Sequence, residues 1–228
     1  MKTLVIIPSF NEEKNLPSLI SDIKKLGYDY LIINDKSTDN TIDLADEENY
    51  SILNLVLNVG IAGVTRIGFK YAYENGYDCV VSIDGDGQHP PEYIGDLIKA
   101  IEEGYDYVVG SRFVTSKKPW TLRMLGSRII CFLIKIKTGV TVTDPTSGMR
   151  AVGKNVIRVF SKNMNFCAEP DTLCYLLRKK YRVKEVDVKM KERLNGKSYF
   201  ISPFKSIKYM IEMFISIIFF EVQIWEEV

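Results

Sequence analysis

The sequence predicts an α/β fold in which a mostly parallel sheet is flanked by helices. Two observations lead to this prediction. Short β-branched runs alternate with helix-like stretches through the first half of the chain, and the early runs end in polar or turn-forming residues. The chain has 228 residues, 46% of them apolar, so it can bury one substantial core and we expect one main domain.

The expected strands are short and rich in β-branched residues. They lie at residues 4–7, 30–33, 53–57, 79–83 and 107–109, and an alternating run at 183–188 predicts one more. The first helix is expected after Asn11, because Leu16, Leu19, Ile20 and Ile23 share one helical face. Beyond residue 112 the pattern predicts a basic helical region, a turn at 143–148, and helices near 154–160 and 170–180.

The C-terminal segment predicts an amphipathic helix, because residues 204–225 are mostly apolar with polar side chains on one side. The longest near-continuous apolar stretch, 213–220, is much shorter than the roughly 20 residues that span a bilayer. We therefore expect a main domain over residues 1–202 and an amphipathic helix over residues 203–228. That helix would lie in a membrane interface or contact protein, either this domain or a second copy in a homo-oligomer.

Charge is divided unequally along the chain. Residues 1–109 hold 8 Lys and Arg against 19 Asp and Glu, a net −11, whereas residues 110–228 hold 22 against 10, a net +12. The basic half is expected to contact anions, such as an anionic membrane surface. Nucleic acid is disfavoured because the basic stretches lack a recognition motif. No export signal and no paired cysteine spacing are evident, so we expect a cytoplasmic chain.

Polar groups follow four of the expected strands: Pro8-Ser9, Asn34-Asp35, Asn58 and Asp84. The carboxyl ends of parallel strands meet at one edge of a sheet, where ligands bind, so these groups should line one crevice. Asp84 and Asp86, spaced i, i+2 among glycines, can direct oxygen ligands toward Mg²⁺ or Mn²⁺. A plain surface turn is the alternative, and His89 is interpreted as a turn residue without a catalytic role.

Six segments together resemble the family 2 glycosyltransferases of the GT-A fold, a Rossmann-like fold. They are I-P-S-F-N-E-E at 7–13, N-D-K-S-T-D-N-T at 34–41, N-V-G at 58–60, D-G-D-G-Q-H-P-P-E at 84–92, G-S-R at 110–112 and D-P-T-S-G-M-R at 144–150. The resemblance is to the dolichyl-phosphate mannosyltransferase and polyprenyl-phosphate glycosyltransferase group. Asn34 and Lys36 replace the family's usual Asp and Gly, which leaves the choice of nucleobase open.

The resemblance implies roles for individual residues. Asp86 and Gln88 would ligate the metal. The donor-binding set would be Pro8, Asn11, Glu12, Asp35, Asn58, Gly60, Asp84, Asp86 and Arg193. The catalytic set would be Asp86, Arg112, Arg123 and Asp144, with the arginines suited to phosphate oxygens. For Arg193 a solvated charge run is an equal alternative.

The resemblance implies an inverting, metal-dependent transfer of a sugar from a UDP- or GDP-linked donor to a polyprenyl phosphate, dolichyl or undecaprenyl, in cell-envelope or glycan synthesis. Such an acceptor is anionic and needs no general base. A sugar hydroxyl of a lipid-linked polysaccharide would need one, from Asp144, Glu169 or Asp171. A non-catalytic nucleotide-binding homologue is the third alternative. For the first two we expect peripheral association with the inner membrane surface or a membrane partner protein.

Overall fold

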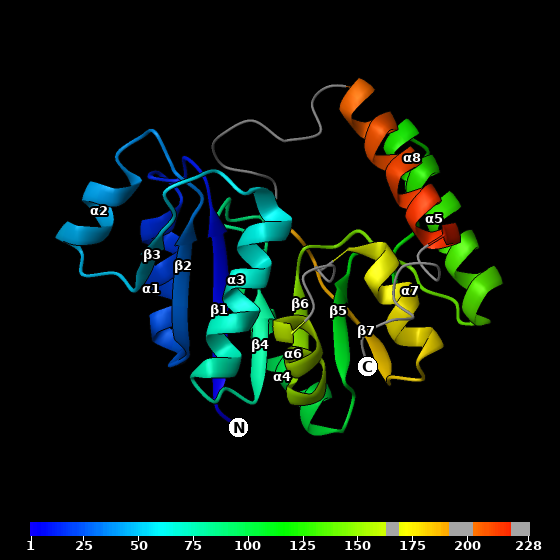
Figure 1. The fold of residues 1–228 in the computed structure, drawn as a ribbon, viewed down its shortest axis with the longest axis horizontal. Coiled ribbons are helices and arrows are strands. Elements are labelled where there is room, and N and C mark those ends of the chain that lie inside the picture. Colours follow the sequence, from blue (N-terminus) through cyan, green and yellow to red (C-terminus); the bar gives the residue numbers. More distant parts are fainter. Residues whose placement is uncertain (163–168, 192–202, 220–228) are drawn as a thin grey trace.

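The computed structural model describes residues 1–162, 169–191 and 203–219, apart from the side chains of residues 122, 123, 203–207 and 219. They form a seven-stranded sheet of order β3-β2-β1-β4-β6-β5-β7, flanked by helices (Figure 1), as predicted. The strands are β1 (Thr3–Ser9), β2 (Asp29–Asn34), β3 (Ile52–Asn54), β4 (Cys79–Ser82), β5 (Tyr107–Ser111), β6 (Arg150–Gly153) and β7 (Val183–Asp187). The helices are α1 (Leu16–Leu26), α2 (Thr41–Glu47), α3 (Gly60–Glu74), η1 (Pro91–Tyr93), α4 (Ile94–Glu102), α5 (Leu122–Thr138), α6 (Lys154–Lys162), α7 (Pro170–Arg178) and α8 (Pro203–Phe219).

Two features of the sheet differ from the prediction. β6 was missed, and it runs antiparallel to both of its neighbours, β4 and β5. The strand predicted at 53–57 was wrong in its extent, because β3 pairs with β2 only from Ile52 to Asn54. The chain then turns away, leaving Val56 86% and Leu57 64% exposed, so this apolar run does not mark a buried strand.

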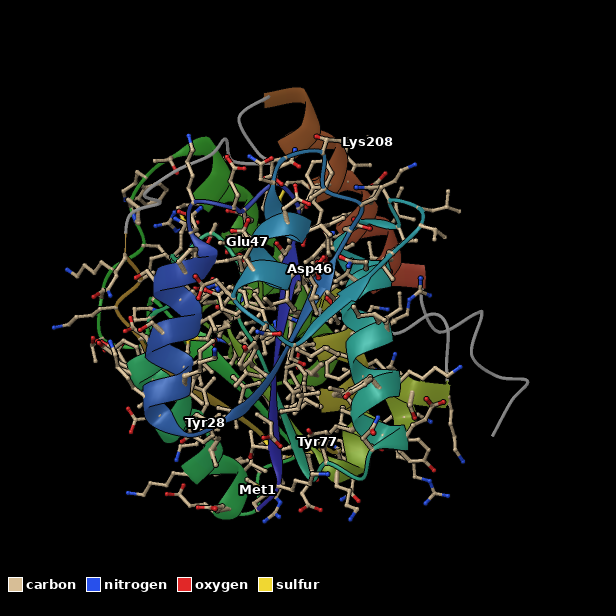
Figure 2. The ribbon with its side chains drawn as sticks, turned by 90° about the vertical axis from the view of Figure 1, so that its left-hand side faces the viewer. Met1, Tyr28, Asp46, Glu47, Tyr77 and Lys208 are labelled. Carbon is tan, nitrogen blue, oxygen red and sulfur yellow. The ribbon has the colours of Figure 1, made fainter. Side chains whose placement is uncertain are left out.

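The alternation of side chains along the strands creates two cores. Leu4 and Ile6 of β1 face the core that is covered by α3, α5, α6 and α7, with a contribution from α8. Val5 and Ile7 face the core that is covered by α1 and α4, and all four apolar residues predicted for the first helical face are buried there. Figure 2 shows α1 and α3 on opposite sides of the sheet.

The carboxyl ends of the parallel strands lie at one edge of the molecule. Ser9 pairs with Asn34, so β1 and β2 end side by side, and β4 runs parallel to β1 on its other flank. Met1, Tyr28 and Tyr77 mark the opposite edge in Figure 2, and Lys208 lies at the far end of the molecule from them. The start of α8 therefore lies toward the same end as the predicted crevice.

The C-terminal helix α8 lies beside α5 and also packs on α7 (Figure 1). Its Ile217 is buried in the core on that face of the sheet. Across the described ranges, no helix is long and apolar enough to cross a membrane.

Helix α3 approaches the sheet closely at Gly68. A Cβ added there would lie 2.9 Å from Ile6 Cδ1 and 3.0 Å from Ile33 Cδ1. Both isoleucines are fully buried, so neither has free space into which to move. The small residue therefore fixes how near α3 comes to β1 and β2.

Gly68→Val should lower the free energy of unfolding by about 1–3 kcal/mol, because its methyl groups need space already filled by Ile6 and Ile33. Urea unfolding followed by circular dichroism measures the change. Gly95→Ala in α4 is the matched control, since a Cβ there meets only Tyr28 Oη at 3.8 Å. Equal effects of the two substitutions would contradict the close packing of α3.

Candidate active site

The turn after β4 is held by its own polar groups. The Asp84 N–H donates to His89 Nδ1 at 2.9 Å, and the Gln88 N–H donates to Asp86 Oδ1 at 2.9 Å. Gly87 takes a left-handed φ of 74°, which lets the chain reverse. Asp86 is buried, whereas the side chain of Asp84 is 39% exposed. The turn thus presents Asp84 at the surface of the crevice.

The end of β1 meets this turn directly. The Gly85 N–H donates to Pro8 O at 3.3 Å, and a Cβ on Gly85 would lie 3.1 Å from that oxygen. Asn11 follows with a left-handed φ of 59°, and its Oδ1 accepts from the Thr38 N–H at 2.7 Å. The β1 loop is therefore tied to the loops after both neighbouring strands.

Asp35, after β2, holds the beginning of α3. Its two carboxylate oxygens accept the N–H groups of Val59 at 2.7 Å and Gly60 at 2.9 Å. The Asn58 side chain donates to the Asp35 carbonyl at 3.0 Å. A carboxylate at a helix N-terminus is stabilised by unpaired N–H groups and by the helix dipole. The structure thus brings Asp35 and Asn58 together, as predicted from the strand ends, and Gly60 of the resemblance-based donor set lies with them.

Glu12 joins the same edge through the loop that precedes α1. Its Oε2 accepts from Asn15 Nδ2 at 2.6 Å, and its N–H donates to Thr41 Oγ1 at 3.3 Å. Lys36, which stands where the family usually has Gly, takes a left-handed φ of 61°. That conformation accounts for a glycine preference at this position.

A small cavity of about 40 Å³ lies between α3 and the Asp84 turn. Its lining comes from α3, β4, two turns and the residue before α7, namely Ile61, Ala62, Thr65, Ser82, Asp84, Gly148 and Glu169. A Cβ on Gly148 would lie 2.8 Å from Asp84 Oδ2, so only glycine fits against this carboxylate. The 144–150 segment thus closes the crevice from the side opposite α3.

Arg112, after β5, forms a two-pronged ion pair with Asp144. Its Nε lies 2.6 Å from Oδ2 and its Nη2 lies 2.8 Å from Oδ1, and Asp144 is fully buried. The Asp144 N–H is bound in turn by Glu185 Oε1 at 2.7 Å. Both oxygens of Asp144 are engaged, so this residue fixes the orientation of Arg112.

Residues 4–160 match the family model described as Glycosyl transferase family 2. The chain belongs to this family and is a glycosyltransferase. It is 34% identical over 215 residues to the UDP-N-acetylglucosamine–dolichyl-phosphate N-acetylglucosaminyltransferase of Methanococcus voltae, covering 81% of this chain and 84% of the relative. It is 32% identical over 214 residues to the undecaprenyl-phosphate mannosyltransferase of Micrococcus luteus, covering 87% of each.

Solved structures share the fold of this glycosyltransferase. Glucosyl-3-phosphoglycerate synthase from Mycobacterium tuberculosis, in complex with Mn²⁺, UDP-glucose and phosphoglyceric acid, superposes with a TM-score of 0.70. The sequences are 17% identical, and the match covers 94% of this chain and 79% of that one. The same synthase has been crystallised with Mg²⁺ and UDP, with a TM-score of 0.68. These likenesses establish the GT-A architecture.

The donor set of the Asp84 turn fits a divalent cation of this kind. Asp86 would supply carboxylate oxygen and Gln88 amide oxygen, which are the hard ligands that Mg²⁺ and Mn²⁺ take. No group of three or more His, Cys, Asp or Glu side chains gathers within the described part of the chain. Mg²⁺ does not require such a group, because it commonly uses one or two carboxylates together with substrate phosphates and water.

Arg150 of β6 was given no role of its own in the D-P-T-S-G-M-R segment at 144–150, yet it supports the turn that carries Gly148. It is fully buried and donates to three oxygens: Ser147 O at 2.6 Å, Tyr107 Oη at 2.7 Å and Pro145 O at 2.8 Å. The turn that carries Gly148 is therefore anchored to β5 and β6. The place of Arg150 in the segment at 144–150 was the available signal.

Glu169 and Asp171, the other candidate bases, are bound by α8. Tyr209 Oη donates to Glu169, while Ser216 Oγ and the Thr172 N–H donate to Asp171. Burial raises the pKa of Glu169, and Asp171 and Asp84 raise it further. The hydrogen bond from Tyr209 and the charge of Arg150 oppose that shift.

The structure does not describe the side chains of two predicted site arginines, Arg123 and Arg193. Arg123 lies in the first turn of α5, and its side chain is outside the described part of the structure. Arg193 lies outside the described residues. His89 was interpreted as a turn residue; it is buried and supports Asp84, a contact that its flanking prolines did not indicate.

Glu169→Gln should change how stability depends on pH. Since burial raises the pKa of Glu169 above its ordinary value of 4.5, the folded protein binds this proton more tightly than the unfolded chain does. The wild-type free energy of unfolding therefore loses a contribution as pH rises from about 4.5 through the raised pKa. Glu169→Gln has no such proton, so its stability relative to wild type should increase across that window.

Urea unfolding at a series of pH values measures this difference. Glu102→Gln on the exposed face of α4 is the matched control, because it makes the same substitution at a residue exposed to solvent. A difference between Glu169→Gln and wild type that stays constant with pH would contradict the burial of Glu169.

Proposed function

We propose that this glycosyltransferase moves a sugar from a UDP- or GDP-linked donor to a polyprenyl phosphate. One observation carries the choice of acceptor: Asp144, Glu169 and Asp171 each accept hydrogen bonds from protein groups. An acceptor that brings its own negative charge needs none of them as a base. The sequence relatives support the proposal, since their names specify dolichyl and undecaprenyl phosphates.

The proposed reaction is a single displacement with inversion. An oxygen of the acceptor phosphate forms a bond to the anomeric carbon while the bond from that carbon to the nucleoside diphosphate breaks. The electron pair leaves with the diphosphate, and no proton transfer is required. Asp84 and the loops held by Asp35 and Asn11 would orient the donor, and Arg112 would place positive charge beside the phosphates.

Asp86 and Gln88 would hold the Mg²⁺ or Mn²⁺ ion, which supplies positive charge against the diphosphate leaving group. Pro8, Glu12 and Gly60 would shape the donor side. Arg123 and Arg193 are proposed phosphate ligands on family position alone. The acceptor would be reached at a membrane surface, with residues 1–202 as the transferase domain and 203–228 as its contact segment.

Transfer to a sugar hydroxyl is the second candidate, and one observation favours it. Glu169 lines the cavity beside Asp84, and its raised pKa suits a group that exchanges protons.

Asp86→Asn should lower the rate of transfer on the order of 10²-fold, because it removes a negative ligand from the diphosphate site. The assay incubates UDP- and GDP-sugars with Mn²⁺ or Mg²⁺ and a polyprenyl phosphate, and measures glycolipid formation. Asp96→Asn, on the exposed side of α4, is the matched control and should retain activity. Absence of glycolipid with every donor would count against the proposed function, and undiminished activity of Asp86→Asn would refute the metal assignment.

Glu169→Gln separates the two acceptors. With a polyprenyl phosphate we expect kcat to stay within about tenfold of wild type, because no general base is needed. If the acceptor is a hydroxyl and Glu169 is its base, kcat should fall by about 10²–10⁴-fold. Steady-state kinetics with each acceptor class, at pH 5–8, decides between them, and full activity of a Glu169→Gln, Asp171→Asn double variant excludes the hydroxyl reaction.

A further inference from the structure

Helix α5 carries an exposed apolar stripe. Leu125, Ile129, Phe132 and Ile136 are spaced i, i+4, i+7 and i+11, which places them on one helical face. They are 46%, 44%, 62% and 63% exposed, respectively. The opposite face of the helix is already satisfied, because Ile130 and Ile134 are buried in the core. The stripe therefore points away from the domain and has no covering element among the described residues.

Helix α8 adds a second stripe beside the first. Its Ile211, Phe214 and Ile215 are 54%, 43% and 50% exposed. Met210 packs onto α5 so closely that its Cε would lie 2.2 Å from a Cβ on Gly126, and Lys137 Nζ binds Ile218 O at 3.3 Å. The two stripes thus belong to one adjacent helix pair (Figure 1). We call these seven side chains the α5–α8 face.

All of the charged residues on α5 are basic. The helix holds Arg123, Arg128, Lys135 and Lys137 and no acidic residue, and the whole segment 113–143 has none. Trp120, just before the helix, is 84% exposed, with the guanidinium of Arg128 4.3 Å from its ring centroid. Apolar side chains bordered by cations, with tryptophan at the margin, suit the interface of an anionic bilayer.

A second copy of the chain is a poorer occupant. A two-fold contact of α5 on its symmetry mate would bring the cations of α5 against one another, and Glu212, the acidic residue described on α8, already lies 3.7 Å from Lys208 of its own helix. The position of this face relative to the active site is a further reason to propose lipid as its occupant. Lys118, Arg128 and Thr143 line an open pocket of about 250 Å³ at the start of α5, and Thr143 adjoins the Asp144 that holds Arg112. The α5–α8 face therefore begins next to the proposed phosphate site.

We propose that the α5–α8 face lies in the interface of an anionic membrane, with α5 contributing as much apolar surface as α8. The proposal rests on the proposed function, which places the acceptor phosphate in a lipid. It extends that function by assigning the docking surface to two helices that are separated by 64 intervening residues, since α5 ends at Thr138 and α8 begins at Pro203. Docking through this face would bring a lipid phosphate to Arg112 without removing its chain from the bilayer.

Flotation with phosphatidylglycerol–phosphatidylcholine vesicles tests the surface. Phe132→Ser, Ile136→Ser should weaken partitioning at least tenfold, because two exposed apolar side chains no longer enter the interface. Leu26→Ser is the matched control: Leu26 is 45% exposed at the end of α1, at the opposite edge of the sheet, and its loss should leave binding unchanged. Lys135→Gln should weaken binding to anionic vesicles and not to neutral ones.

Wild-type flotation of Phe132→Ser, Ile136→Ser would overturn the proposal, as would a change from dimer to monomer on size exclusion with vesicle binding intact. Glycolipid formation from a short polyprenyl phosphate in detergent is assayed in parallel. A wild-type protein that makes glycolipid in detergent and does not bind vesicles refutes the docking surface alone. One that binds vesicles and makes no glycolipid refutes the proposed function alone.

Discussion

Most of the site depends on the hydrogen bonds that the buried guanidinium of Arg150 donates. Burying a charge among apolar strands is costly unless its hydrogen-bonding groups are satisfied. Here three donors of one side chain reach Tyr107, Pro145 and Ser147, which joins β5, β6 and the intervening turn. That turn includes Gly148 against Asp84 and begins at Asp144, the partner of Arg112. A single positive charge therefore supports both the cavity wall and, through the turn that contains Asp144, the orientation of Arg112, the proposed phosphate ligand.

Because β6 is antiparallel to both of its neighbours, the turn that Arg150 holds lies at the same edge of the sheet as the other site residues. The parallel strands β1, β2 and β4 bring their carboxyl ends to one edge, as open α/β sheets do. Inserting β6 between β4 and β5 reverses the chain, so the turn before β6 arrives at the same edge as those carboxyl ends. The turn before β6 thus meets the turn after β4 at this edge, where Gly148 and Asp84 line the same cavity.

The sequence predicted the parts of the fold that local patterns specify. Strands β1, β2 and β4 and helix α1 have uninterrupted apolar periodicity, and Asp84 and Asp35 follow strands directly. Strand β6 was missed because four residues beginning with a charged arginine carry no strand pattern. The supporting contacts were beyond sequence reasoning for a different reason: Tyr107 and Arg150 are 43 residues apart, and Glu169 and Tyr209 are 40 apart.

Helix α8 combines two kinds of surface that a periodicity argument cannot separate. Its inner side includes Tyr209 and Ser216, which bind the carboxylates of Glu169 and Asp171, while its outer side exposes Ile211, Phe214 and Ile215 beside the Lys208–Glu212 ion pair. Burial and the nearby charge of Asp84 disfavour the ionised form of Glu169. The hydrogen bond from the Tyr209 hydroxyl partly offsets this effect. Displacing α8 would remove that hydroxyl from Glu169. The ionisation of Glu169 therefore depends on the position of α8, the helix whose outer side is proposed to meet lipid.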